Sequence, residues 1–197
     1  MTRPLFVFAH GAGAGSQSLW MQSWAARLEP LGTVHRFDYP YMQKPGRRPP
    51  DRMPRLLEAH RDAVTLARAD HNGPVFLLGK SMGSRVGCHL SQELPVDGVI
   101  CFGYPLQSGG KTPRLRDEIL RSMTTRTLLI QGTRDPLCPM DIMTTLMTEL
   151  GPYVQLHVVE GGDHSLVLRK KDERSLGYDQ TESDDRIARA FSLFISQ

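Results

Sequence analysis

The sequence predicts an α/β fold, a three-layer α/β/α sandwich around a mostly parallel sheet of about six strands. Short apolar runs alternate along the chain with longer segments in which apolar residues recur at helical spacing. The short runs are apolar throughout, which is typical of strands that helices cover on both faces. A chain of 197 residues is long enough for one such domain and too short for two ordinary domains. We therefore expect a single domain over residues 1–197.

The individual elements are placed by their ends. Glycine, proline and polar clusters interrupt the apolar runs. The first helix carries Trp20 and Trp24 at helical spacing, and both are expected in the core. The predicted strands are 5–9, 34–39, 75–78, 96–102, 127–130 and 154–159. The predicted helices are 18–29, 54–70, 82–93, 113–122 and 187–195, with one more along Met140, Met143 and Met147. The polar stretch 169–185 is expected to be exposed.

One stretch carries the strongest functional signal. The apolar strand at 75–78 leads directly into Gly79-Lys80-Ser81-Met82-Gly83, and helical spacing begins at once. This G-x-S-x-G pattern is typical of a nucleophile elbow, where the serine sits on a sharp, strained turn between a strand and a helix. The two glycines remove side chains that would collide as the chain reverses. Ser81 is the predicted nucleophile, and an ordinary strand-to-helix turn is the alternative.

A glycine-rich turn, His10-Gly11-Ala12-Gly13-Ala14-Gly15, follows the first strand. Its spacing does not match the dinucleotide fingerprint G-x-G-x-x-G, and no Walker-type lysine follows it. In serine hydrolases a turn at this place supplies a backbone N–H to the oxyanion hole. We expect Ala12 to be that donor and Met82, at the first turn of a helix, to be the second. His10 is assigned a structural role. A merely flexible turn is the alternative.

Two later loops carry the other groups that a serine nucleophile needs. Asp135 follows the strand at 127–130, and His164 lies in a glycine-rich loop after the strand at 154–159. The chain order serine, acid, histidine matches one of the known orders of a catalytic triad. Asp-Pro is also a common turn dipeptide, so Asp135 has a purely structural alternative. Asp163 is a rival acid, but adjacent side chains generally point apart, and we expect it to hold the loop.

Three further side chains are expected to line a substrate pocket. Tyr41 and Met42 begin a proline- and arginine-rich loop at the carboxyl end of a strand, where α/β proteins place their sites. Tyr104 lies in the loop after the strand at 96–102, which is too short to contain a lid domain. An open site, shielded at most by loops, is therefore expected. The arginines of the 41–50 loop are expected to form a solvated surface.

The composition excludes several other classes. The net charge is +3, and the 24 basic residues are scattered among 21 acidic ones, so nothing indicates binding to nucleic acid. No apolar stretch approaches the length of a membrane span, and the run at 5–9 is shorter than a signal-peptide core. The three cysteines, Cys88, Cys101 and Cys138, form no C-x-x-C pair, which favours a reducing compartment. We expect a cytoplasmic protein, a monomer or weak homodimer, that uses no cofactor and no metal.

Together these motifs resemble the α/β-hydrolase superfamily over nearly the whole chain. The matching segments are 10–14, 79–83, 132–136 and 162–165. Segments 79–85 and 102–106 are similar to a small lidless group related to dienelactone hydrolase. That group also contains the hydrolase-like domains of a testis-expressed animal protein and of a subunit of a histone-acetylating complex. The resemblance implies a minimal α/β-hydrolase fold without a lid domain and a triad of Ser81, His164 and Asp135. A serine stands where dienelactone hydrolase has its cysteine.

The function expected from these residues is hydrolysis of small ester or thioester substrates, of the carboxylic-ester type, through an acyl-enzyme on Ser81. A different class is also open. A hydrolase-like scaffold could bind a protein partner without turnover, as the kinship with a chromatin-complex subunit suggests. Labelling by a fluorophosphonate separates the two, because only an activated serine reacts.

Overall fold

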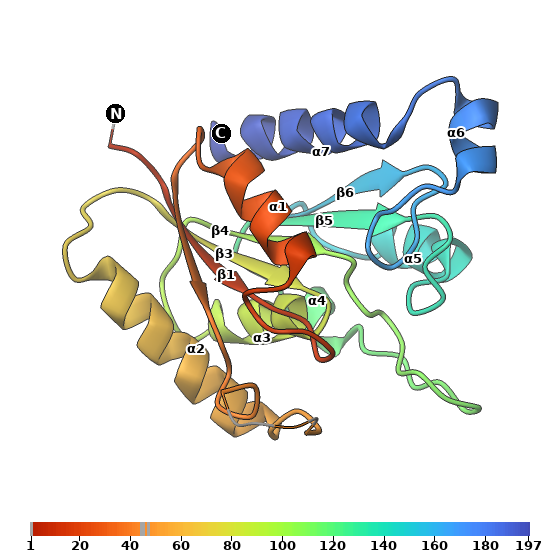
Figure 1. Cartoon of the computed structure of the whole chain (residues 1–197). Helices are drawn as coiled ribbons and strands as arrows, with labels where there is room; N and C mark the ends of the chain where they lie inside the picture. Colours follow the sequence, from red (N-terminus) through yellow and green to blue (C-terminus); the bar gives the residue numbers. More distant parts are fainter. Residues whose placement is uncertain (1, 44–45, 47) are drawn as a thin grey trace.

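The computed structural model describes residues 2–43, 46 and 48–197. Its centre is one six-stranded sheet in the order β2-β1-β3-β4-β5-β6, and every neighbouring pair of strands is parallel (Figure 1). The predicted α/β class and parallel sheet are thus confirmed. The strands are β1 (Leu5–Ala9), β2 (Thr33–Phe37), β3 (Val75–Lys80), β4 (Gly98–Phe102), β5 (Thr127–Gly132) and β6 (Val154–Val159).

Helices form the two outer layers. In Figure 1, α1 and α7 lie over one face of the sheet, and α2 and α3 lie over the other. The helices are α1 (Leu19–Leu28), α2 (Met53–Arg68), α3 (Met82–Leu90), α4 (Glu118–Arg121), α5 (Met140–Met147), α6 (Lys170–Leu176) and α7 (Gln180–Ile195). Within the described ranges, no helix has the length and apolar character that crossing a membrane would need.

The strands read as unbroken apolar runs because both of their faces are covered. In β1, Leu5 and Val7 pack into the core shared with α2, α3 and α5. Phe6 and Phe8, which alternate with them, pack into the core shared with α1 and α7. All five residues of β1 are buried. The sheet is therefore a rigid support for whatever follows the ends of its strands.

One predicted helix is much shorter than expected. The charged segment 113–122 contains only the single turn of α4. Its first residues instead return beside the preceding chain, where Leu115 forms an antiparallel bridge with Gln107. Gly110, with φ of 111°, lies in the connection between these two residues. Most of the segment is thus an extended arm rather than the predicted helix.

The stretch 169–185 was expected to be exposed, and within it only Ser183 is buried. It also contains α6 and the first turns of α7, which the sequence did not predict. Gly177 ends α6 in the left-handed region, at φ of 74°. Asp179 then caps α7 by accepting a hydrogen bond from the N–H of Glu182. α6 and the first turns of α7 have few apolar residues, which is why helical periodicity is weak in this part of the sequence. The remaining predicted elements are present, with ends shifted by a few residues.

His60 is a fully buried histidine on the inner face of α2. Its ring lies 5.0 Å from that of Phe37, and its Nδ1 is 3.2 Å from the hydroxyl of Tyr39. Among the described residues, its Nε2 has no hydrogen-bond partner. Burial lowers the pKa of His60 to about 3, because the imidazolium form would lose its hydration. The side chain is therefore neutral at physiological pH.

Acid is expected to destabilise the fold through His60. The unfolded chain takes up a proton near the ordinary pKa of 6.5, whereas the folded protein resists it until about 3. The free energy of unfolding therefore begins to fall as the pH drops below 6.5, and at pH 5 it is lower by roughly 2 kcal/mol. His60→Gln removes this titration. Urea unfolding at pH 7 and pH 5 should show a smaller fall in the free energy of unfolding for the variant than for the wild type. Equal falls would contradict the assignment.

Candidate active site

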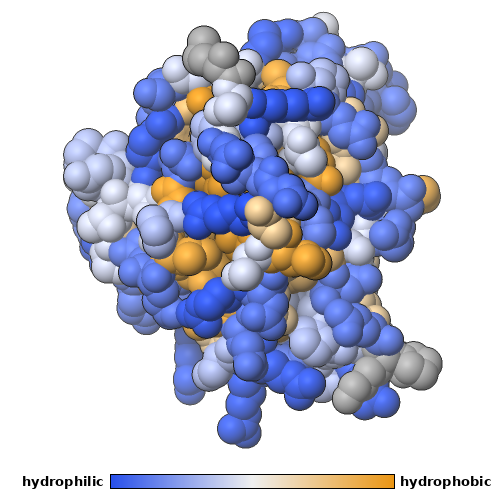
Figure 2. Space-filling view, turned by 90° about the vertical axis from the view of Figure 1, so that its left-hand side faces the viewer, coloured by the Kyte–Doolittle hydropathy of each residue, from blue (hydrophilic) through white to orange (hydrophobic). Residues whose placement is uncertain are grey.

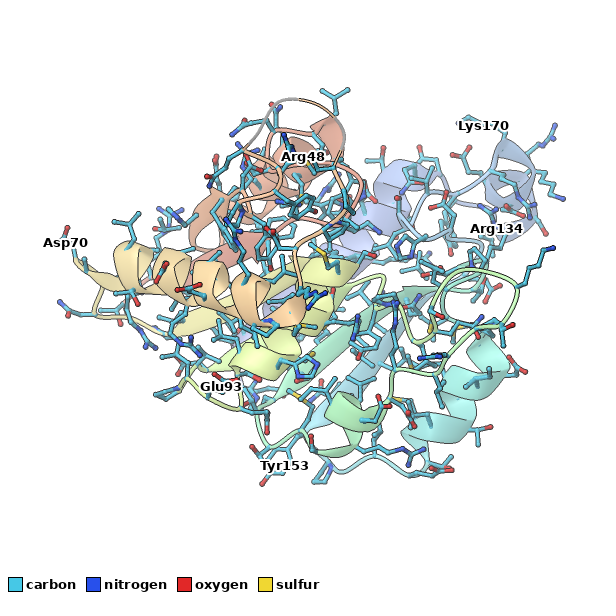
Figure 3. All side chains as sticks on the ribbon, turned by 90° about the horizontal axis from the view of Figure 1, so that it is seen from below. Arg48, Asp70, Glu93, Arg134, Tyr153 and Lys170 are labelled. Atoms are coloured by element: carbon cyan, nitrogen blue, oxygen red, sulfur yellow. The ribbon has the colours of Figure 1, made fainter. Side chains whose placement is uncertain are left out.

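The site lies at the carboxyl-terminal ends of the parallel strands. Figure 2 looks onto the opposite edge, where the strands begin and where hydrophilic residues surround an apolar area. In Figure 3, Arg134 and Lys170 lie toward the carboxyl ends of the strands, whereas Asp70 and Glu93 lie at the other end of the molecule. The loops after β1, β3, β5 and β6 meet at the carboxyl ends of the strands, so residues far apart in sequence come together there.

Ser81 occupies a strained turn between β3 and α3. Its φ is 52° and its ψ is −110°, a conformation that a residue with a side chain rarely adopts and that costs on the order of 1–3 kcal/mol. The flanking glycines make the turn possible. A Cβ on Gly79 would lie 2.2 Å from the backbone N of Ser84, and one on Gly83 would lie 2.6 Å from the carbonyl oxygen of Ala9. Both distances are far below van der Waals contact.

In the structure the side chains of Ser81, His164 and Asp135 form one chain of hydrogen bonds. The hydroxyl Oγ of Ser81 is 2.9 Å from Nε2 of His164, and Nδ1 of His164 is 2.7 Å from Oδ2 of Asp135. Since the carboxylate accepts the Nδ1–H, the lone pair of Nε2 faces the serine hydroxyl. This geometry equips the imidazole to take a proton from Ser81.

Asp135 is only 3% exposed, so its charge requires partners. Burial alone would raise the pKa of its carboxyl, but hydrogen bonds outweigh burial and the pKa lies below its ordinary value. His164 is the foremost partner. The backbone N–H of Leu137 donates to Oδ1 at 2.8 Å, and Nε2 of Gln131 donates to Oδ2 at 2.6 Å. Asp135 is therefore ionised and fixed in place at neutral pH.

The loop that carries His164 is tied to the end of β5. Arg134 donates from Nε to the carbonyl of Gly161 at 2.7 Å and from a terminal nitrogen to the carbonyl of Val167 at 3.0 Å. Asp163 does not face the imidazole. Its Oδ1 accepts the N–H of Ser165 at 2.7 Å and that of Val167 at 3.0 Å. The carboxylate of Asp163 thus closes the loop, and Arg134 holds both ends of the loop.

The glycine-rich turn is fixed from behind by two side chains. The peptide between Gly11 and Ala12 has its carbonyl oxygen 2.7 Å from Nδ1 of His10 and 3.2 Å from the hydroxyl of Tyr41. His10 is fully buried, and its Nε2 accepts the N–H of Tyr39 at 3.1 Å, so the proton belongs on Nδ1. In a trans peptide the N–H points opposite to the carbonyl. The N–H of Ala12 is therefore directed away from His10 and Tyr41.

The predicted oxyanion donors, Ala12 and Met82, lie at this edge, in the glycine-rich turn and at the start of α3. Among the described residues, the N–H groups of Ala12 and Met82 have no hydrogen-bond acceptor. A Cβ on Gly11 would lie 3.5 Å from the Cβ of Ser81, which shows how closely the glycine-rich turn approaches the serine. A free N–H at the start of a helix attracts negative charge. The two donors are available to an anionic oxygen that forms next to Ser81.

A cavity of about 390 Å³ opens beside Ser81. Ala12, Ala14, Met21 and Leu137 supply apolar walls, and His164 lies at the polar end. Trp20 also lines this cavity, although we predicted it as core, whereas Trp24 is buried as predicted. The cavity suits a small, mostly apolar group next to a reactive carbonyl.

The three predicted pocket residues have other places. Tyr104 is fully buried, and its hydroxyl donates to the carbonyl of Arg116 at 2.8 Å, so the expectation that it lines the pocket was wrong. Tyr41 is buried behind the glycine-rich turn and does not line the cavity beside Ser81. Met42 lines a neighbouring cavity that shares Ala12 and Gly13 with the first one. Residues 44, 45 and 47 of the proline- and arginine-rich loop lie outside the described residues.

The sequence interpretation missed the parts played by Trp20 and Lys80. Nothing in the helical spacing of α1 distinguishes Trp20 from the core residue Trp24. Lys80 does carry a signal, since a lysine at the end of an otherwise apolar, buried strand is unusual and requires a partner. Lys80 lines the same cavity as Ser81.

Comparison with known proteins shows the family and the fold. A family model described as an alpha/beta hydrolase domain matches residues 2–196. A crystal structure described as that of a putative hydrolase of the alpha/beta superfamily, from Xanthomonas campestris pv. campestris, is 23% identical. The alignment covers 100% of this chain and 99% of that chain, with a TM-score of 0.63.

Two further solved structures have a similar fold. One is an alpha/beta serine hydrolase without a lid from Xanthomonas campestris, 19% identical over 84% of this chain and 74% of that chain, with a TM-score of 0.62. The other is the monoacylglycerol lipase of Paleococcus ferrophilus, 16% identical over 98% of this chain and 94% of that chain, with a TM-score of 0.69. At these identities the likeness concerns the fold.

Proposed function

Because this chain belongs to the family of alpha/beta hydrolase domains, we propose that it is a serine hydrolase that cleaves small esters or thioesters. The observation that carries the proposal is the hydrogen-bonded line from Ser81 through His164 to Asp135, with contacts of 2.9 and 2.7 Å. Fold alone does not define activity. A strained serine next to a histidine that a buried carboxylate orients is the arrangement that acyl transfer requires.

In the first half of the reaction, Oγ of Ser81 attacks the carbonyl carbon of the substrate. Nε2 of His164 takes the hydroxyl proton, while the ionised Asp135 holds the Nδ1–H and stabilises the imidazolium. The tetrahedral intermediate then collapses. Its bond to the leaving oxygen or sulfur breaks, and His164 returns the proton to that atom. The acyl group remains on Ser81 as an ester.

In the second half, water replaces the leaving group. His164 takes a proton from the water as the water oxygen attacks the acyl carbon. The bond between the acyl carbon and Oγ of Ser81 then breaks, His164 returns the proton to Oγ, and the carboxylic acid leaves. The N–H groups of Ala12 and Met82 are proposed to hold the oxyanion in both halves. Each such donor contributes on the order of 3 kcal/mol to lowering the barrier.

The cavity supports the proposed substrate class. Its volume of about 390 Å³ and its apolar walls favour a short or medium acyl group over a long lipid chain. No lid domain is inserted in the part of the chain that the structure describes, which favours access of water to the acyl-enzyme without a large opening motion. The likeness to the structure of a monoacylglycerol lipase is in line with an ester substrate.

A fluorophosphonate probe tests the proposal directly. The wild type should form a covalent adduct on Ser81, and Ser81→Ala should not react. Ser165→Ala is a matched control because Ser165 is another serine that lines the cavity, and this variant should label like the wild type. Hydrolysis of a panel of aryl esters and acyl thioesters of short and medium chain length then defines the substrate range. A folded wild type without labelling would instead support the partner-binding scaffold.

Tyr41→Phe is expected to lower kcat about tenfold with little change in KM. The hydroxyl of Tyr41 holds the carbonyls of Gly11 and Ala12, both at 3.2 Å. Burial raises the pKa of Tyr41 to about 12, so the hydroxyl stays protonated and able to donate. Without it, the donor of Ala12 is less firmly oriented, which affects the transition state more than the bound substrate.

Steady-state kinetics of both variants check this prediction, with Tyr104→Phe as the control. Tyr104 also loses a buried hydroxyl that donates to a backbone carbonyl, but in a loop away from the glycine-rich turn. Its kcat should stay within about twofold of the wild type. Equal effects of the two substitutions would show that the loss is a general packing effect.

A further inference from the structure

Lys80 is the last residue of β3 and precedes Ser81 directly. Side chains alternate along a strand, so Lys80 points to the same face as Leu78, toward the layer formed by α1 and α7. It is only 9% exposed. Burying an ammonium group is costly unless the protein supplies acceptors for it. The partners of Lys80 therefore indicate what this cation does.

Two groups receive the ammonium of Lys80. Nζ donates a hydrogen bond to the backbone carbonyl oxygen of His164. It also lies over the indole of Trp20, 5.4 Å from the ring centre. Burial lowers the pKa of Lys80 to about 8, against the opposite effect of the nearby carboxylates of Asp135 and Asp163. The charged form therefore predominates at pH 7.

Trp20 holds Ser165, the residue that follows His164 in the same loop. Its Nε1–H donates to the carbonyl oxygen of Ser165 at 2.9 Å. The indole itself is wedged against Phe102 and Phe8, with ring centres 5.6 and 6.1 Å away. We refer to Lys80 and Trp20, which hold the carbonyls of His164 and Ser165, as the carbonyl clamp. It connects the strand of the nucleophile and the start of α1 to the loop of the histidine.

Gly103 makes room for the clamp at the end of β4. Its φ is +62°, and a Cβ at this position would lie 2.6 Å from the carbonyl oxygen of His164 and 3.1 Å from Nζ of Lys80. Any larger residue would push the lysine and the loop apart. Two independent features, a buried cation with an acceptor and a glycine that admits it, thus converge on one backbone carbonyl.

We propose that Lys80 is a positioning residue that, with Trp20, sets the distance between His164 and Ser81 by holding the main chain of His164 against the end of β3. This inference rests on the proposed function, since it assigns Lys80 a part in the same reaction. Asp135 fixes the imidazole from its far side, and the clamp fixes the backbone from which the imidazole projects. Reaction rates are sensitive to such placement, because a misplacement of about 1 Å can cost about 10²-fold.

Lys80→Met is the principal test, because methionine is unbranched and of similar length but lacks the donor and the charge. We expect kcat and the rate of fluorophosphonate labelling to fall by about 10²-fold, with KM within about threefold of the wild type. Trp20→Phe, which keeps a ring and removes the N–H, should show a smaller loss of the same kind. Lys111→Met is the matched control, because Lys111 is an exposed lysine in another loop, and it should behave like the wild type.

Two readouts separate positioning from other roles. The strongly downfield NMR resonance of the His164 Nδ1–H reports the contact with Asp135 without any substrate. It should broaden or disappear in Lys80→Met and stay unchanged in Lys111→Met. In Lys80→Ala, added n-propylamine supplies the atoms that are missing beyond Cβ and should restore labelling. It should not restore labelling in Lys80→Met, where the space is filled.

The outcomes are distinct. A folded Lys80→Met that labels at the wild-type rate and keeps the downfield resonance overturns the inference. So does a rise in KM with unchanged kcat, which would make Lys80 a substrate contact. If Lys80→Met does not fold, recovery of Lys80→Ala by n-propylamine supports the inference and lack of recovery overturns it. If the wild type never labels, the proposed function fails, but the NMR comparison still decides whether Lys80 positions His164.

Discussion

Replacing His164 by alanine is expected to lower kcat for ester hydrolysis by about 10⁵- to 10⁶-fold. Without the imidazole, which lies 2.9 Å from Oγ of Ser81, the hydroxyl has no group to take its proton. The oxyanion donors and the cavity remain, so KM should change little and some rate enhancement over water should survive. Steady-state kinetics on an aryl ester, with a folded variant confirmed by circular dichroism, measure the effect.

His71→Ala provides the matched control. His71 follows α2 at the edge where the strands begin, and its ring lies 3.3 Å from the carbonyl of Pro74. Its replacement should leave kcat within about twofold of the wild type. A His164→Ala variant that retains more than about a hundredth of wild-type kcat would contradict general-base catalysis by this residue, which contributes 10²- to 10⁴-fold by itself.

Asp135→Asn is expected to lower kcat by about 10⁴-fold, with the backbone geometry preserved. The carboxylate accepts three hydrogen bonds, from His164, Gln131 and the N–H of Leu137. An asparagine has one oxygen and one NH₂ group, so it cannot accept from all three. If its NH₂ faces Nδ1, the histidine must carry its proton on Nε2, where it opposes the serine hydroxyl.

The rival acid supplies the comparison. In Asp163→Asn the side-chain oxygen can still accept the N–H groups of Ser165 and Val167. Its kcat should fall by less than about tenfold, because the loop keeps both of these hydrogen bonds. If Asp163→Asn lost about 10⁴-fold and Asp135→Asn did not, the assignment of the acid would be reversed. Kinetics of the two variants on one aryl ester decide between the carboxylates.

Much of this arrangement could be predicted because it depends on local chemistry. The elbow at Ser81 needs glycine at two fixed offsets, and the atoms that a Cβ would meet at Gly79 and Gly83 explain both. The parallel sheet could be predicted because short apolar runs alternate with helices along the chain. Acid and base could be assigned to loops because parallel strands all end at one edge of the sheet.

What the sequence could not supply was the direction of individual side chains. Tyr104 follows a strand at the correct edge, but it turns into the core after Gly103, whose φ of +62° reverses the local path. α6 has no buried residues, so it has no apolar periodicity to detect. It is held by ion pairs, including one of 3.2 Å between Asp172 and Arg134 from the distant loop after β5. Such contacts exist only once the chain has folded.

The order of the strands also places the groups of the proposed reaction in two different parts of the sheet. The loops after β1 and β3, in the middle of the sheet, hold the serine and the oxyanion donors, whereas those after β5 and β6 hold the acid and the base. β6 is an edge strand with half-exposed residues, paired on one side alone among the described strands. Edge elements open at lower free energy than central ones. In the proposed reaction the base, His164, therefore lies on the thermally weaker part of the site. On heating, we expect the contact between His164 and Ser81 to be lost before the turn at Ser81 unfolds.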